Sequence, residues 1–263
     1  MHEHRTNLLD ALILHYPQIK LVLISTGEMG RRNIETTSVF LVVVVGQISW
    51  EVNNTLIVKY PGIIPVSVKI TLASTSPIRS QLLRSAHVQF TTCTSDFDEE
   101  PVKAQLIKEK VAPYQIALAL AAGKAEHVSM EKDGLVLGCD QILALDDRLL
   151  SKPKTKDEAR HQLVMLQGRD HMLLSAAVIF ESTRQVWSHV GQVTLTMRDL
   201  SDKYLDMYLD RNWPKIQNSV GGYKLEEEGV RLFSKIQGDY FTVLGMPLVE
   251  VLEYLGRRGA IEI

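Results

Sequence analysis

The chain has few cysteines and no excess of basic charge, and each absence excludes a class of protein. Its 263 residues include two cysteines, Cys93 and Cys139, which lie far apart and form no CxxC pair. We therefore expect neither a disulfide framework nor a cysteine-based zinc site, and a reducing cytosol is the simplest setting. Lysine and arginine number 29 against 31 aspartates and glutamates, so no positive field favours general nucleic-acid binding. A phosphate site must then be local and confined to a pocket.

Long hydrophobic runs are also missing. The longest apolar run is Val39 to Val45, followed by Gly46 and Ile48, and it is far shorter than the ~20 residues that span a bilayer. It lies too far from the first residue for a conventional signal peptide, and no short basic segment leads into it. We expect a buried strand here and no membrane partner.

Several common catalytic motifs are absent. The eight histidines show no HxxH or HExxH spacing, which argues against a histidine-rich zinc centre. The chain also contains no GxSxG and no P-loop. Its chemistry must be sought in other residue patterns.

The distribution of apolar and turn residues divides the chain near residue 67. Residues 1–67 contain two strand-like segments, Leu21–Ser25 and Phe40–Val45, and no cluster of catalytic residue types. From Val68 onward, strand-like and helix-like segments alternate, which predicts an α/β fold. Two interpretations of residues 1–67 stay open: an accessory segment that folds onto the main domain, or translated upstream sequence from a misassigned start.

For several later helices and strands, the sequence predicts where the element begins and ends. The sequence TKDE at 155–158 is a capping box, and a glycine follows the expected helix end. Apolar and β-branched runs predict paired strands, and helical periodicity predicts further helices. The predicted elements are a helix that begins at the Thr155 capping box, runs through Leu166 and is closed by Gly168, paired strands over Met172–Phe180 and Val186–Met197, a helix over Ser201–Asn212, and a last helix from Pro247 to Gly256.

The segment LASTSPIRSQLL, Leu72–Leu83, predicts a strand-to-helix joint that can bind phosphate. Ser76 is a natural N-cap, and Pro77 fits the first helical position. Such a helix start presents unpaired N–H groups and the positive end of a dipole. Ser74 adds a hydroxyl and Arg79 a positive fork. The alternative, an ordinary cap with a solvated arginine, is more frequent for so short a motif.

Asp140 is the second candidate, because a carboxylate interrupts the apolar run Leu135–Leu143. We expect the strand to end at Gly138, which places Asp140 where α/β proteins put active-site groups. A buried charge costs free energy unless it is paired, hydrogen-bonded or bound to metal. A catalytic carboxylate and a structural one remain equally open.

Three further charged residues are candidates. Lys152 precedes a proline, in extended geometry, ahead of the capped helix. Glu99, in the acidic cluster Asp96–Glu100, is a candidate ligand for a hard metal. Lys124 follows the helical run Ala117–Ala122 and is a candidate phosphate contact. For each, the alternative is a solvated surface residue.

Taken together, these segments resemble the Maf family of septum-formation-inhibitor proteins, which act as nucleoside triphosphate pyrophosphatases. The matching segments, in order, are LASTSPIRSQLL, FDEE, LAAGKA, LVLGCDQ, SKP, LQGRDH, SVGGYKLEEEG and QGDYFTVLGMPL. The resemblance covers essentially Val68 to the C-terminus and leaves out residues 1–67. The resemblance implies a Maf/ITPase-like mixed α/β sheet with two lobes around a nucleotide cleft. It also implies hydrolysis between the α and β phosphates, which yields a monophosphate and pyrophosphate.

The resemblance also implies roles for individual residues. Asp140 matches the family's proton acceptor, and Glu99 matches its second important carboxylate. Because oxygen ligands suit hard cations, the implied cofactor is Mg²⁺ or Mn²⁺ held at Glu99 and Asp140. The positions that match the family's phosphate contacts are Ser74, Arg79, Lys124 and Lys152.

Three positions differ between branches of the family, here Ile78, Gln141 and Glu226. Gln141 and Glu226 resemble the branch that acts on 7-methyl-GTP, whereas the branch that acts on dTTP and UTP tends to have Thr and Gln there. The Glu226 carboxylate can accept hydrogen bonds from guanine N1–H and its amino group. Ile78 departs from both patterns, where tryptophan or arginine is typical, and removes a stacking surface for a cationic base. Ser80 also replaces a basic residue common in the motif.

A second function remains as an alternative: a catalytically weak nucleotide-binding regulator of cell division or septum formation. The charged residues retained at the family's positions argue against simple loss of activity. For partners, we expect a nucleoside triphosphate substrate, no nucleic acid and no membrane, and a homodimer stays open. The expected location is the cytoplasm.

Overall fold

The computed structural model describes residues 19–22, 42–45 and 68–263, and the chain divides into two units, Met1–Val66 and Ser67–Ile263. In the first unit, β1 (Ile19–Val22) pairs antiparallel with β2 (Val42–Val45). Each of these strands overlaps one of the two strand-like segments predicted there. The burial expected for the Val39–Val45 run and the two interpretations of residues 1–67 lie outside the described residues and stay predictions.

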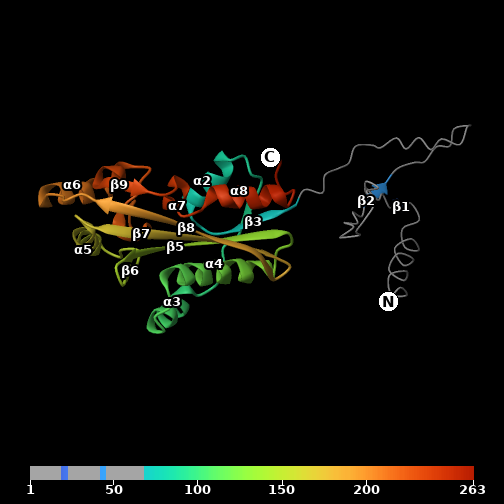
Figure 1. Ribbon diagram of the computed structural model, residues 1–263, viewed down its shortest axis with the longest axis horizontal. Coiled ribbons are helices and arrows are strands. Elements are labelled where there is room, and N and C mark those ends of the chain that lie inside the picture. Colours follow the sequence, from blue (N-terminus) through green and yellow to red (C-terminus); the bar gives the residue numbers. More distant parts are fainter. Residues whose placement is uncertain (1–18, 23–41, 46–67) are drawn as a thin grey trace, which may run out of the picture. The chain divides into compact units, whose positions relative to one another are not determined.

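The second unit is built on a seven-stranded mixed sheet (Figure 1). The order is β4-β3-β5-β7-β8-β9, with β6 also paired to β5. β3 runs parallel to β4 and β5, and the other pairs are antiparallel. This confirms the expected mixed α/β fold. The strands are β3 (Ile70–Ala73), β4 (Thr91–Thr92), β5 (Leu135–Leu145), β6 (Arg148–Leu150), β7 (Asp170–Glu181), β8 (Arg184–Met197) and β9 (Phe233–Gln237).

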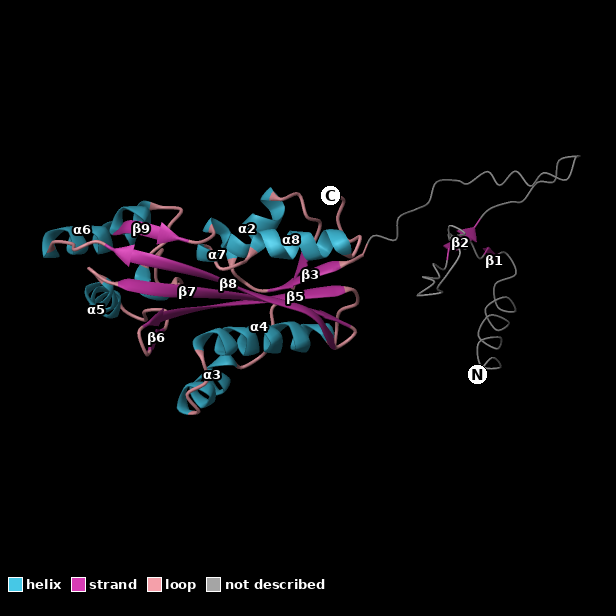
Figure 2. Cartoon of the chain, viewed as in Figure 1, coloured by secondary structure: helices cyan, strands magenta, loops and turns pink. Residues whose placement is uncertain are grey.

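Helices cover both faces of this sheet (Figure 2). α2, α7 and α8 lie on one side of the central strands, and α3 and α4 lie on the other. The helices are α2 (Pro77–Ser85), α3 (Glu99–Lys108), α4 (Pro113–Ser129), α5 (Lys156–Leu166), α6 (Asp202–Asn212), α7 (Tyr240–Val243) and α8 (Leu248–Arg257). Two short 3₁₀ segments are η1 (Val220–Gly222) and η2 (Glu228–Leu232).

Strand β5 organises the core because successive side chains point to opposite faces of a sheet. Leu135 and Leu137 pack in one cluster with apolar side chains of α2 and α8. Val136 packs in another with the apolar face of α4. Farther along, Leu143 joins a third cluster with side chains of α5 and α6. The strand therefore links two ends of the domain that have separate cores, in keeping with two lobes.

Helix α4 packs unusually close to β5 at Gly138. A Cβ on Gly138 would lie 2.2 Å from the carbonyl oxygen of Ala121 and 2.9 Å from Cβ of Ala125. Only glycine permits this approach of helix to strand. The close packing carries Lys124, which lies between these two alanines on α4, to the residues that follow Gly138.

Most of the predicted boundaries are confirmed. Thr155 Oγ1 accepts a 3.1 Å bond from the Glu158 amide at the start of α5, which ends at Leu166 as predicted. β7 and β8 are the predicted strand pair and run antiparallel, and Ser201 caps α6. The last helix begins at Leu248, after Pro247, and ends at Arg257, one residue beyond the predicted Gly256.

The prediction that a strand ends at Gly138 is wrong. β5 continues through Gly138 and Asp140 to Leu145, because β7 pairs with it from Leu135 to Ala144. What ends opposite Gly138 is the neighbouring strand β3, whose last residue pairs there.

The helices among the described residues are each too short, or not apolar enough, to cross a bilayer.

Candidate active site

A cavity of about 490 Å³ lies where β5 loses a strand partner along one edge. β3 pairs with this edge as far as Gly138, and β6 resumes pairing only at Leu143. Asp140 and Gln141 lie in the gap, where β3 has turned away into the segment that opens α2. The cavity is therefore a consequence of the sheet topology.

All the residues proposed from the sequence line this cavity. They come from both ends of the domain, as expected for a cleft between two lobes. Those residues are Ser74, Ile78, Arg79, Glu99, Lys124, Asp140, Gln141, Lys152 and Glu226. The structure thus brings together side chains that lie far apart in the chain, although their individual roles stay predictions.

Lys124 joins the two candidate carboxylates. Its Nζ lies 2.7 Å from Oδ1 of Asp140 and 2.8 Å from Oε2 of Glu99. Asp140 is buried, at 8% exposed, whereas Glu99 is the first residue of α3 and its side chain is 41% exposed. The ammonium therefore compensates the buried charge that made Asp140 notable in the sequence.

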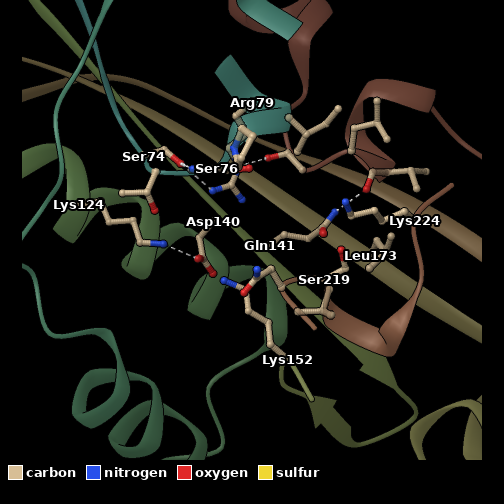
Figure 3. A pocket seen from close by; sticks show the side chains of 18 of the residues that line it. Ser74, Ser76, Arg79, Lys124, Asp140, Gln141, Lys152, Leu173, Ser219 and Lys224 are labelled. Carbon is tan, nitrogen blue, oxygen red and sulfur yellow. Dashed lines mark hydrogen bonds and ion pairs between the residues drawn. The ribbon is translucent and has the colours of Figure 1, made fainter. Parts of the chain in front are cut away.

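Asp140 and Gln141 are neighbours in β5, so their side chains leave on opposite faces of the strand. Figure 3 shows Asp140 beside Lys124 and Lys152, with Gln141 directed away from them. Asp140 meets α4 through Lys124, and Gln141 meets the last carbonyls of α7. The cavity consequently has a charged region around Asp140 and a second region around Gln141.

The amide of Gln141 has a defined orientation. Its Nε2 donates to the carbonyl oxygens of Thr242 at 3.1 Å and Val243 at 3.0 Å, and lies 3.0 Å from Oγ of Ser175. Ser175 is fully buried and itself donates a 2.7 Å bond to the Thr242 carbonyl. A flipped amide would place its oxygen against these carbonyls, so the nitrogen faces α7. Gln141 then offers the cavity a carbonyl oxygen, which is an acceptor.

The start of α2 differs in one detail from the strand-to-helix joint predicted from the sequence. Ser76 occupies the N-cap position and Pro77 is the first helical residue, but the Ser76 side chain makes no cap hydrogen bond. The Ser76 amide instead donates to Oγ of Ser74 at 3.2 Å (Figure 3). The Ser74 hydroxyl keeps its own hydrogen to donate to a ligand oxygen.

Arg79 is held on two sides by backbone carbonyls. Its Nε donates to Gly245 at 2.8 Å and its Nη1 to Cys139 at 2.9 Å. The Cys139 carbonyl lies on β5 just past the last pair with β3, so Arg79 satisfies a group that the sheet leaves open. Nη2 has no hydrogen-bond partner within residues 68–263 and remains for a ligand.

Lys152 adds a third cation to the cavity. It follows β6 in a loop that Gln162 holds through a 3.0 Å bond to the Ser151 carbonyl. Burial lowers the pKa of Lys152, and the nearby charges of Arg79 and Lys124 lower it further. Such a cluster of cations favours an anion of several charges, such as a polyphosphate.

Cys139 is excluded as a nucleophile. It is fully buried next to Asp140, and burial raises the pKa of its thiol to about 11. The reactive thiolate form is therefore scarce near neutral pH.

The acidic run at 226–228 has one member directed to the cavity. Glu228 instead receives hydrogen bonds from Arg211 and Asn212, and the Arg211 bond is the main cause that lowers its pKa to about 2. Glu227 pairs with Lys224 and Lys215. Glu226 is exposed, lines the cavity and has no ion pair within residues 68–263.

Sequence reasoning missed several contributors. Lys224 lines the cavity, and its only signal is its place in the segment SVGGYKLEEEG. Ser175 and Gly245 reach the site through Gln141 and Arg79, across separations of 34 and 166 residues. No local pattern can reveal contacts of that range.

The donor set fits a hard divalent cation. Glu99 and Asp140 already converge on one positive group, the Lys124 ammonium. Within the described part of the chain, no cluster of three or more His, Cys, Asp or Glu side chains can hold a metal. Two carboxylates with substrate oxygens and water match the usual environment of protein-bound Mg²⁺.

A mixed α/β domain with a cavity that joins carboxylates to the cations Arg79, Lys124 and Lys152 defines a class of protein that handles phosphorylated ligands. A family model described as Maf-like protein matches residues 69–258, and the chain belongs to the Maf family.

Curated relatives match over nearly their whole length. The nucleoside triphosphate pyrophosphatase of Ruegeria pomeroyi is 55% identical over 198 residues, which cover 75% of this chain and 100% of the relative. A protein of the same name from Caulobacter vibrioides is 45% identical, and the match covers 74% of this chain and 98% of the relative. The 7-methyl-GTP pyrophosphatase of Brucella abortus is 41% identical, and the match covers 75% of this chain and 100% of the relative.

Proposed function

We propose that this protein is a nucleoside triphosphate pyrophosphatase that hydrolyses the bond between the α and β phosphates. The observation that carries the proposal is the placement of Asp140, a buried carboxylate at the gap in the sheet, beside Lys124 and close to the other cavity cations. The names of the relatives, at 41–55% identity, support the same activity.

The residues have separable tasks in this reaction. Asp140 accepts a proton from the attacking water, which becomes the new oxygen on the α phosphate. Arg79, Lys124 and Lys152 offset the charge of the triphosphate and of the departing pyrophosphate. A divalent cation held by Glu99 and Asp140 would add further charge compensation on the phosphate oxygens. The products are a nucleoside monophosphate and pyrophosphate.

The second region of the cavity is suited to the base. Gln141 presents a carbonyl oxygen and Glu226 a carboxylate, so both are acceptors. Guanine offers two neighbouring donors, N1–H and its amino group, whereas uracil and thymine offer one ring N–H. We propose a guanine-type base, including 7-methylguanine, as the preferred substrate class. Ile78 packs against the apolar core cluster of α2 and α8 and supplies no aromatic face.

The test is a substrate panel of 7-methyl-GTP, GTP, UTP and dTTP, with Mg²⁺ or Mn²⁺, read as pyrophosphate release. The guanine nucleotides should give the highest kcat/KM. Glu226→Gln should reduce that preference, whereas Glu227→Gln, at the neighbouring carboxylate, should leave it unchanged. A preference for UTP or dTTP would overturn the assignment of the base.

The alternative, a nucleotide-binding regulator of septum formation, predicts binding without product release across the metals. The location and the assembly state are further parts of the proposal. The two cysteines are free in the structure, which supports a cytoplasmic setting. A homodimer stays a prediction, to be checked by light scattering of the purified full chain.

A further inference from the structure

Three carbonyl oxygens in one short turn hold the side chains that face the ligand. The turn comprises residues 242–245, at the end of α7. Thr242 and Val243 accept from the amide of Gln141, and Gly245 accepts from Nε of Arg79. One stretch of backbone thus contacts both the proposed base-binding residue and a proposed phosphate-binding residue.

The turn is itself firmly anchored. Oδ2 of Asp239 accepts a 2.6 Å bond from the Thr242 amide, and Ser175 donates to the Thr242 carbonyl. Residues 242–245 are all buried. The carbonyls therefore form a fixed surface against which longer side chains are oriented.

Gly245 is the residue of this turn that accepts a hydrogen bond from Arg79. Its φ is +96°, a conformation that L residues rarely adopt. A Cβ on Gly245 would lie 3.3 Å from both Nε and Nη2 of Arg79. Any side chain at Gly245 would push on the guanidinium, including the nitrogen left for the ligand.

We propose that Gly245 is a positioning residue that acts through Arg79: its carbonyl fixes Nε, its lack of a side chain leaves room for the guanidinium, and Nη2 is thereby aimed at substrate phosphate. The inference rests on the proposed function for its phosphate ligand. It assigns no chemistry to Gly245 itself. Its effect must be independent of the base, because Arg79 belongs to the charged region of the cavity.

The test compares Gly245→Ala with Gly259→Ala in the full chain. Gly259 also has a positive φ, +64°, but a Cβ there would have no atom within 4 Å. Both substitutions should lower Tm through backbone strain. Gly245→Ala alone should raise KM about tenfold, equally for GTP and UTP, since small displacements of a binding group are costly. An equal KM for the two variants would overturn the proposal.

A double-mutant cycle with Arg79→Ala separates positioning from a general structural effect. If Gly245 acts through Arg79, Gly245→Ala should add no further increase in KM once Arg79 has been truncated. Full additivity of the two effects would overturn the proposal.

A third readout does not depend on turnover. Hydrogen exchange of the Arg79 Nε–H, followed by ¹⁵N NMR and assigned with Arg79→Lys, should be slow in the wild type and in Gly259→Ala. It should be fast in Gly245→Ala. Unchanged exchange would overturn the positioning role. A wild type that hydrolyses no nucleotide while showing the predicted exchange pattern would instead overturn the proposed function and leave the Gly245–Arg79 relationship supported.

Discussion

Lys124 donates a 2.7 Å hydrogen bond to Asp140, across the contact between α4 and β5. The bond depends on Gly138, which lets the helix approach the strand, and the same ammonium reaches Glu99. Loss of either partner would leave the other without its compensating charge, which is strongly destabilising for a buried ion pair.

Replacement of Asp140 tests the proposed proton acceptor. Asp140→Asn keeps the size of the side chain and an oxygen that can accept from Lys124, but the amide cannot take up a proton. We expect pyrophosphate release to fall by about 10²–10⁴-fold, with an unchanged circular dichroism spectrum. Activity at the wild-type level would show that Asp140 is not the base.

Replacement of Lys124 tests the cation site. Lys124→Gln leaves Glu99 and Asp140 without their shared ammonium, so Tm should fall in buffer that contains a chelator. Added Mg²⁺ or Mn²⁺ should then raise Tm by more than it does in the wild type, because the carboxylates gain a new partner. Thermal unfolding by calorimetry measures both effects.

The matched control for that experiment is Lys156→Gln. Lys156 pairs with Asp210 at an exposed position between α5 and α6, and we expect a small change in Tm with no extra metal response. If Lys124→Gln and Lys156→Gln respond alike to Mg²⁺, the pair Glu99 and Asp140 is not the metal site.

The orientation of the Gln141 amide predicts that glutamate at this position lowers the free energy of unfolding. Gln141→Glu removes the donor that faces Thr242 and Val243 and sets a carboxylate against their carbonyl oxygens. We expect a loss of about 1–3 kcal/mol in the free energy of unfolding, measured by urea denaturation. Gln192→Glu, at an exposed position on β8, should cost little. Equal stability of the two variants would indicate that the Gln141 nitrogen does not face α7.

His171 predicts a pH dependence of stability. It is 2% exposed, and its Nε2 lies 2.8 Å from the hydroxyl of Tyr223, a residue that lines the cavity. Burial lowers the pKa of His171 to about 4, against a smaller opposing effect of Asp170. The neutral imidazole is therefore the form that the fold favours.

The direction of this pH dependence follows from the difference in proton binding between the unfolded and the folded chain. Between pH 6.5 and about 4 the unfolded chain protonates this histidine while the folded chain does not, so its contribution is fully present above pH 6.5 and is lost as pH falls towards 4. The loss amounts to about 3 kcal/mol. His171→Gln, which does not titrate, should lose less stability than the wild type between pH 7.5 and 4.5 in urea denaturation. Equal losses of stability in the wild type and in His171→Gln would contradict the assignment of this pH dependence to His171.

Local sequence was sufficient for most elements. The Thr155 N-cap and the Pro77 helix start each depend on residues within one turn of a helix, and both are found in the structure. The reciprocal bond of the predicted capping box differs, because Glu158 accepts from the Lys154 amide. The strand end predicted at Gly138 failed because a strand continues as long as a partner pairs with it. That partner, β7, begins more than 30 residues later in the chain.

The candidate site likewise depends partly on local sequence and partly on the tertiary structure. The sequence by itself determined which chemical groups are present, from the serine-rich segment before Arg79 to the carboxylate at Asp140, and their order matched a known family. Only the tertiary structure decided that β3 leaves β5 at Gly138 and opens a cavity there. It also decided that Gly245 and Ser175 orient Arg79 and Gln141. Hydrogen bonds between residues so distant in the chain depend on how helices and strands pack, and packing is a property of the whole domain.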